Sequence, residues 1–120
     1  MGPLFIMPRD GILRAIYVLF STYGYIIFEP GAIIQPFVCL AVSNTNDFVF
    51  TVLQNTMTFT DTYVGNGEYP PHVNRRGSLT NLNVAVPEGT LVAIVAGIMA
   101  QNITDMVHGT FLVHGGLFWE

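Results

Sequence analysis

Several segments of this chain are hydrophobic at both odd and even positions. Residues 12–20 are interrupted by a single charge, Arg14, and residues 91–100 carry none. Successive side chains of a β-strand point to opposite faces, so a strand that meets water on one side alternates apolar and polar residues. These two segments therefore need cover on both faces. One face can fill the interior of a small domain, and the other predicts contact with a further molecule.

Two later segments do alternate. In residues 57–63, Met57, Phe59 and Tyr63 alternate with threonines, and in residues 81–86 three hydrophobic residues oppose two asparagines. A period of two is typical of strands that face water on one side. Both segments are therefore expected to be half-exposed strands.

The remaining pattern also favours β-structure, because turn signals separate β-rich segments and no stretch has the spacing of an amphipathic helix. We predict an all-β single domain over residues 1–120, most simply a two-sheet jelly-roll sandwich of roughly eight to ten strands. Residues 64–77, the longest polar segment, are expected as a loop, and Gly115 and Gly116 as bends or bulges. Strands are expected at residues 4–7, 13–21, 25–28, 33–42, 48–53, 57–63, 81–86 and 91–100, with a final strand or pair within 107–119.

Composition strengthens the prediction of association. Hydrophobic residues make up 51% and charged residues 10% of the chain, lysine is absent, and the mean hydropathy is +0.50. Soluble domains average about 25% charged residues, so much of this surface is expected to be covered. The uncharged stretches are shorter than the ~20 apolar residues of a spanning helix, and we expect no membrane segment. The net charge of −4 argues against nucleic-acid binding.

Groups that carry catalysis are few. The lone Cys39 allows no intrachain disulfide, and its place between Val38 and Leu40 is typical of a small buried hydrophobic residue. Acidic residues fall mostly in or beside predicted loops, where they keep the ends of the domain solvated. We therefore expect no catalytic residues, no cofactor and no enzymatic activity.

His114 is a weak candidate for a metal site. It lies six residues from His108, roughly 20 Å along a strand, so the two imidazoles cannot share an ion within one chain. Three copies of His114 that meet on a three-fold axis would form a site from one residue per chain. The alternative is an ordinary polar or partly buried histidine.

Loops on a rigid sandwich are a usual place of recognition. The segment 64–77 combines aromatic, basic and rigid residues, and the candidates for surface binding are Tyr69, His72, Arg75 and Arg76. The alternative is a solvated connection whose arginines pair with acidic residues of a neighbouring subunit.

Two motifs are similar to those of a known family. The turn MPRDG at residues 7–11, and the segment GSLTNLNVAVP at residues 77–87 before a long apolar strand, resemble the carboxy-terminal domain of collagen-like exosporium glycoproteins of the BclB and BclA type from spore-forming bacilli. The resemblance implies a complement- and tumour-necrosis-factor-like jelly-roll head that forms a homotrimer at the tip of a collagen-like stalk on the spore surface. The family's Gly-X-Y stalk is absent from these 120 residues. Residues 64–78 differ from the family's corresponding stretch, so no ligand is carried over.

We therefore expect a structural, self-associating head domain of a spore-surface fibre, facing outward from the exosporium. Other spore-surface proteins or glycans are further possible partners. The alternatives are a ligand- or glycan-binding tip domain of a viral or bacterial fibre and, in third place, a membrane-active β protein. The sequence does not say which parity of the two-faced strands forms the trimer interface, so the candidates come from both: Tyr17, Leu19, Val92, Ile94, Ile98 and Phe111.

Overall fold

The computed structural model describes residues 4–43, 49–65, 67–102 and 110–120. In these ranges the chain consists of strands, turns and bends without a helix, which confirms the all-β prediction. The strands are β1 (Leu4–Ile6), β2 (Gly11–Tyr23), β3 (Ile26–Phe28), β4 (Ile33–Ser43), β5 (Thr51–Phe59), β6 (Tyr63–Val64), β7 (Gly67–Tyr69), β8 (Asn74–Leu79), β9 (Val84–Val86), β10 (Leu91–Gln101) and β11 (Thr110–Trp119).

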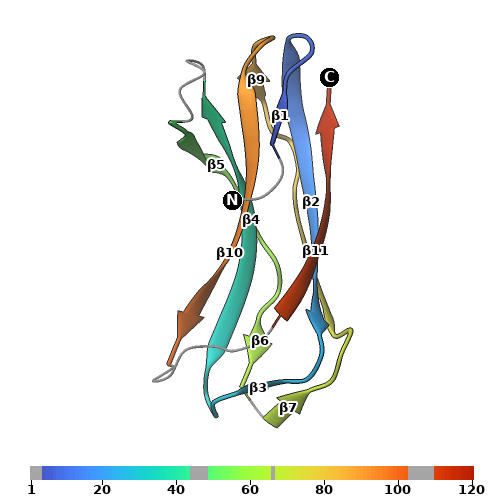
Figure 1. Cartoon of the computed structure of the whole chain (residues 1–120), viewed down its shortest axis with the longest axis vertical. Helices are drawn as coiled ribbons and strands as arrows, with labels where there is room; N and C mark the ends of the chain where they lie inside the picture. Colours follow the sequence, from blue (N-terminus) through green and yellow to red (C-terminus); the bar gives the residue numbers. More distant parts are fainter. Residues whose placement is uncertain (1–3, 44–48, 66, 103–109) are drawn as a thin grey trace.

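Two antiparallel sheets form the layers of the molecule (Figure 1). The five-stranded sheet has the order β1-β10-β4-β5, with β6 paired to β4. The four-stranded sheet has the order β11-β2-β8, with β9 paired to β2. A short ribbon of β3 and β7 lies at the lower end in Figure 1. The arrangement is consistent with the predicted β-sandwich.

The interior between the sheets is filled by alternate residues of the long strands. On β2 these include Ile16, Val18 and Phe20, and the facing sheet contributes Leu40 and Val92. Each of the five side chains is at most 4% exposed. Because the even-numbered residues point inward along this part of β2, the odd-numbered ones point outward.

A β-bulge explains part of the two-faced pattern near the start of β2. The register between β11 and β2 shifts, so that Phe118 pairs with Ala15 and Trp119 with Leu13, which leaves Arg14 as the extra residue. Beyond the bulge the odd-numbered Leu13 turns inward and is 0% exposed. Hydrophobic residues of both parities thus enter the same core, and this segment needs less external cover than its sequence suggests.

The threonine side of β5 faces inward. Thr56 and Thr58 are at most 1% exposed, whereas Phe59 is 38% exposed. Both buried hydroxyls are hydrogen-bonded: Thr56 donates to the Leu53 carbonyl and accepts from the Leu40 N–H, and Thr58 donates to the Thr56 carbonyl. Burial of a polar group costs little when the group is hydrogen-bonded. The alternation therefore predicted a half-exposed strand without revealing which side meets water.

The segment 64–77, expected as a loop, contains β7 and most of β8, so that prediction is wrong. β8 pairs with β2 along its whole length, and its residues are alternately exposed and half-buried. The sequence did not indicate this strand because its residues are mostly polar or basic. Long charged side chains can still cover apolar surface with their aliphatic stems while their charged ends reach water. Gly115 and Gly116 likewise lie within the continuous β11, and the register shift occurs at Phe118 and Trp119 instead.

Candidate functional site

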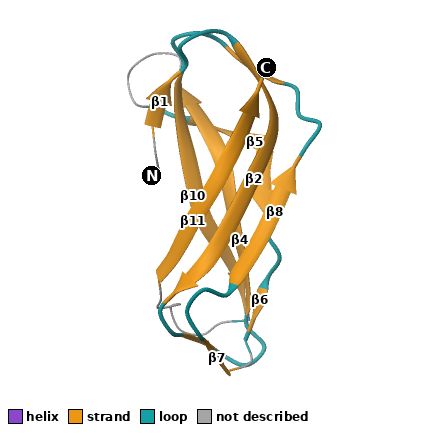
Figure 2. Cartoon of the chain, turned by 90° about the vertical axis from the view of Figure 1, so that its right-hand side faces the viewer, coloured by secondary structure: helices purple, strands orange, loops and turns teal. Residues whose placement is uncertain are grey.

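The strands β11, β2 and β8 of the four-stranded sheet lie side by side in Figure 2, and their outer face presents a regular array of side chains. Six outward positions form two rows across β11, β2 and β8. The rows are His114, Leu19, Arg76 and Gly116, Tyr17, Ser78. We call these six positions the shelf. They share one parity because the neighbouring Val18 of β2 points into the core.

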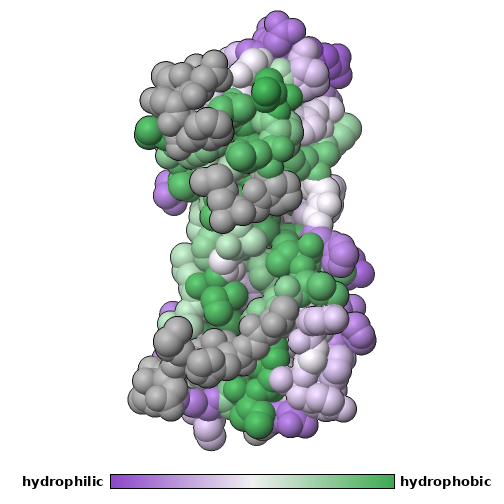
Figure 3. All heavy atoms as spheres, viewed as in Figure 1, coloured by the Kyte–Doolittle hydropathy of each residue, from purple (hydrophilic) through white to green (hydrophobic). Residues whose placement is uncertain are grey.

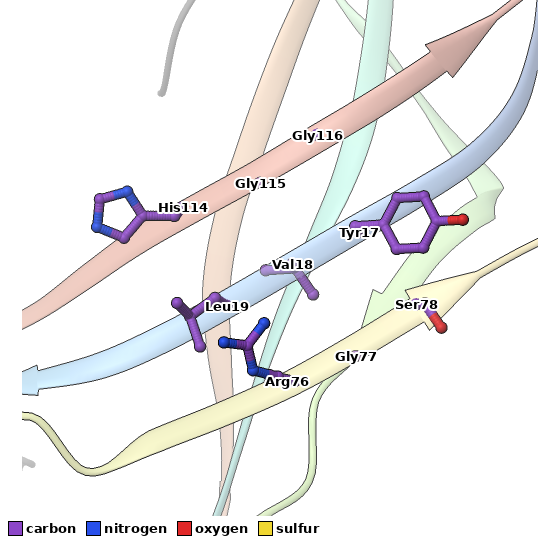
Figure 4. Close-up of a pocket in the computed structure, with 9 residues that line it drawn as sticks. All are labelled: Tyr17, Val18, Leu19, Arg76, Gly77, Ser78, His114, Gly115 and Gly116. Atoms are coloured by element: carbon purple, nitrogen blue, oxygen red, sulfur yellow. The ribbon is translucent and has the colours of Figure 1, made fainter.

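The shelf lines a shallow hollow of 520 Å³ that is open to solvent (Figure 4). Gly116 keeps it open, since a Cβ at this position would have no heavy atom within 4 Å. In Figure 4 the Arg76 side chain reaches from β8 toward Leu19, whereas Tyr17 and Ser78 lie on the other side. The Tyr17 ring and the Ser78 hydroxyl thus lie at one end of the hollow and the Arg76 guanidinium at the other, with strand backbone between them.

The charge of the shelf is opposite to that of the whole chain, whose net charge is −4. Arg76 and His114 are exposed, and neither side chain has a hydrogen bond or an ion pair with another described residue. By contrast, Arg14 pairs with the Glu120 carboxylate at 2.9 Å. A guanidinium is charged at any ordinary pH, so the shelf offers a permanent positive charge to a ligand.

Two of the four residues predicted for surface binding stabilise the fold instead. The Tyr69 hydroxyl donates to the Val64 carbonyl at 2.6 Å and accepts from the Val64 N–H at 3.1 Å. Arg75 donates through Nε to the Thr62 carbonyl at 2.9 Å, and its guanidinium carbon lies 4.6 Å from the centre of the Tyr63 ring. Their polar groups are occupied within the chain.

The other two residues of this set lie apart. His72 is exposed with a φ of 66°, and its N–H donates to the Thr22 carbonyl at 2.7 Å in the turn before β8. Arg76 points to the opposite side of β8 from Arg75, because the two are adjacent in a strand. Of the four residues, Arg76 alone belongs to the shelf.

The buried Tyr63 predicts a pH dependence of stability. Burial raises the pKa of its phenol above the ordinary value of about 10, while the nearby Arg75 lowers it by a smaller amount. The folded state therefore favours the neutral phenol, and this stabilisation is lost as the pH rises through the folded-state pKa. Between pH 9 and pH 12 the urea midpoint of the wild type should fall further than that of Tyr63→Phe. Equal slopes would contradict the assignment.

The predicted interface residues lie in different environments. Val92 is 0% exposed in the core of its own chain, so it offers no surface to a second copy, and its assignment to the interface is corrected. Phe111 is half-buried, with its ring centre 6.1 Å from that of Phe20 and 5.6 Å from that of Tyr63. Tyr17 belongs to the shelf, as does Leu19.

Ile94 and Ile98 lie on β10, which beyond residue 93 is the outermost strand of its sheet in the described part of the chain, as β11 is of the other. We call the side of the sandwich between these two strands the open edge. A cleft of 430 Å³ is walled there by hydrophobic side chains of both sheets, among them Ile94 and Val113. Ile98 is 38% and Val113 is 42% exposed, although both occupy core-facing positions of their strands. Figure 3 faces this edge and shows hydrophobic residues gathered along it. Val113 carries no signal in the sequence, because its exposure depends on how far the two sheets separate.

Within the described residues, no three His, Cys, Asp or Glu side chains gather as metal ligands. His108 lies outside those residues, and a site made of three His114 side chains stays a prediction that requires further copies. Cys39 is buried, as expected, and its burial raises the pKa of the thiol.

The part of the chain that the structure describes contains no apolar helix with the length needed to span a bilayer. The shelf and the open edge are interpreted from their own chemistry, since no family model, no curated protein and no solved structure matches this chain.

Proposed function

We propose that this chain is a non-enzymatic structural domain that associates with copies of itself through the open edge. The observation that carries the proposal is the exposure of hydrophobic side chains on the inner faces of both sheets, above all Ile98 and Val113. These residues occupy positions that a closed sandwich would bury. Exposed apolar patches of this kind mark contact surfaces in soluble proteins.

The backbone at the open edge supports the same proposal. β1 pairs with β10 only at residues 91–93, so residues 94–101 have β4 as their one neighbouring strand among the described residues. Over the ranges that the structure describes, β11 is likewise paired with one strand only, β2. Strand edges with free N–H and C=O groups tend to pair with other chains unless they are covered. Closed rotational symmetry covers them without forming open-ended assemblies.

The expected energy is sufficient for a stable assembly. Burial of apolar surface contributes about 25 cal/mol per Å², and stable interfaces bury roughly 1,200–2,000 Å² in total. The free energy gained by burial of apolar surface in an interface of this size exceeds the free-energy cost of association, which is roughly 4–15 kcal/mol. The apolar wall of the cleft and the low content of charged residues favour such a contact.

The finer parts of the proposal combine topology with the family resemblance. The first long strand, β2, pairs with the last, β11, and the second, β4, pairs with the second last, β10. Such nested pairing supports a jelly roll. The number of three subunits, and the place at the tip of a stalk on the outer surface of a spore, come from the resemblance of the MPRDG turn and of residues 77–87 to the exosporium glycoproteins.

Light scattering tests the proposal through the absolute mass. The wild type is expected at about three times 13.2 kDa, and Ile98→Asp at 13.2 kDa, because a carboxylate in an apolar contact loses its hydration. Val113→Asp should act in the same way. Ile27→Asp is the matched control, since Ile27 is 69% exposed on β3 and does not line the cleft, and this variant should keep the wild-type mass. A monomeric wild type, or a trimeric Ile98→Asp, would contradict the proposal.

One observation favours a second candidate function, that of a ligand-binding tip domain. The shelf brings together the Arg76 guanidinium, the Tyr17 ring and the Ser78 hydroxyl on the outer face of the sheet, next to the cleft.

A further inference from the structure

We propose that the shelf binds a saccharide that carries a carboxylate group. The cleft borders the shelf, since Tyr17, His114 and Gly116 line both. Arg76 and Ser78 line the shelf alone, so Arg76 tests this inference separately from self-association. His114 and Gly116 have the outward parity of this strand, whereas Val113 and Leu117 have the inward parity. Three features point to such a ligand: the Arg76 guanidinium, the Tyr17 ring and the open hollow that they line.

The cationic end of the shelf fits a carboxylate. Arg76 and His114 flank Leu19 from the two neighbouring strands, which places their Cα atoms about 10 Å apart. The guanidinium fork matches the two oxygens of a carboxylate, and the imidazole supplies a further donor. No acidic residue occupies an outward position of β11, β2 or β8 in their described registers. The carboxylate of Glu120 lies beyond Tyr17 and is paired with Arg14 at 2.9 Å, and the Arg76 end of the shelf meets no acidic side chain in these registers.

The other end of the shelf fits the body of a sugar. Tyr17 is 52% exposed, and the opposite position on β11 is Gly116, which leaves open space beside the ring. The face of an aromatic ring carries partial negative charge and attracts the polarised C–H groups of a pyranose. The Ser78 hydroxyl can donate to and accept from sugar hydroxyls. The hollow of 520 Å³ is shallow and open to solvent, so a sugar ring could lie against it with one face on the protein.

The position within the sheet favours a saccharide over an acidic peptide. Extended peptides commonly bind by adding a strand to a sheet edge, where backbone groups are free. The shelf is centred on β2, which is paired with β11 on one side and with β8 on the other. Its backbone groups are used in these ladders, so side chains alone read the ligand. This suits a compact molecule with a flat apolar face and one charged group.

An NMR titration of the isotope-labelled 120-residue chain tests the inference. Trigalacturonate is the acidic probe, galactotriose is the neutral control, and triglutamate presents carboxylates on a peptide. We expect trigalacturonate to shift the amide signals of the shelf in β11, β2 and β8, with at least tenfold weaker binding of either control. Equal binding of triglutamate would overturn the saccharide assignment, and equal binding of galactotriose would overturn the role of the carboxylate. An unresponsive shelf overturns the inference as a whole.

Matched variants assign the contacts. Arg76→Gln should weaken binding of trigalacturonate about tenfold or more, as expected for loss of a charge-assisted hydrogen bond, whereas Arg9→Gln removes the same charge at an exposed position outside the shelf and should have no effect. Tyr17→Phe should keep the affinity and Tyr17→Leu should lose it, because the ring face makes the contact. Unchanged affinity in Arg76→Gln or in Tyr17→Leu would overturn the proposal.

A further variant tests the location of the site and includes a check on folding. Gly116→Leu fills the hollow from an open surface position and should abolish binding while the amide spectrum outside the shelf stays unchanged. Full binding by this variant would contradict the location of the site. Light scattering on Arg76→Gln distinguishes the two proposals, since Arg76 does not line the cleft and a binding-deficient variant with wild-type mass leaves self-association intact.

Discussion

Replacement of Gly77 by alanine is expected to lower the free energy of unfolding by about 3 kcal/mol. A Cβ at this position would lie 2.0 Å from the carbonyl oxygen of Phe59 and 2.7 Å from its carbonyl carbon. The obstacle is backbone, which cannot turn away as a flexible side chain can, so β8 and β5 would have to separate. Overpacking of an interior costs roughly 1–3 kcal/mol and occasionally more.

Gly116→Ala is the matched control for Gly77→Ala, because it adds the same methyl group to the same sheet where no heavy atom lies within 4 Å. Its free energy of unfolding should stay within about 0.5 kcal/mol of the wild type. Urea unfolding at one protein concentration, followed through the fluorescence of Trp119, measures both variants. Similar urea midpoints for the two variants would contradict the close approach of β8 to β5.

Replacement of Tyr63 by alanine is expected to cost about 3–5 kcal/mol, the range for removal of a large buried aromatic side chain. Tyr63 is 0% exposed, and its ring centre lies 5.5 Å from that of Tyr69, 5.6 Å from that of Phe111 and 6.1 Å from that of Phe28. The guanidinium of Arg75 packs over the same ring. The alanine variant would remove the centre of this cluster, which joins the end ribbon to the main sheets.

Tyr63→Phe separates the ring from its hydroxyl group. The hydroxyl donates to the Val73 carbonyl at 2.7 Å, and loss of this hydrogen bond should cost about 1 kcal/mol. Urea unfolding of the two variants side by side should therefore show a much larger loss for alanine than for phenylalanine. A loss in Tyr63→Ala as small as that in Tyr63→Phe would show that the ring is not part of a packed cluster.

Most residues of the candidate site were singled out from the sequence, but the sequence did not indicate that they lie side by side. Tyr17 and Leu19 were predicted for an interface, Arg76 for a binding loop and His114 for a metal, each for a separate reason. Only the register between β11, β2 and β8 places the four side chains together. Ser78 and Gly116 were missed, since a serine on a concealed strand and a glycine within a strand carry no local signal.

The limits of the fold prediction have similar causes. The bulge that turns Leu13 inward depends on how β11 pairs with β2, and the inward threonines of β5 depend on partners such as the Leu40 N–H. Neither partner is close in sequence. In the segment 81–86 the alternation of exposed and covered residues was predicted correctly, with Val86 buried and Asn83 exposed, but the strand itself, β9, covers only Val84–Val86.

The sequence by itself determined the β character of this chain, the places of most turns and its shortage of charged surface, because backbone preference, turn chemistry and composition act over a few residues. The tertiary structure alone decided which parity of each strand is buried, where the sheets leave an open edge, and which side chains share the shelf. These features depend on pairing between strands far apart in the chain, such as β2 with β11. A shift of one residue in that register would exchange the inner and outer faces.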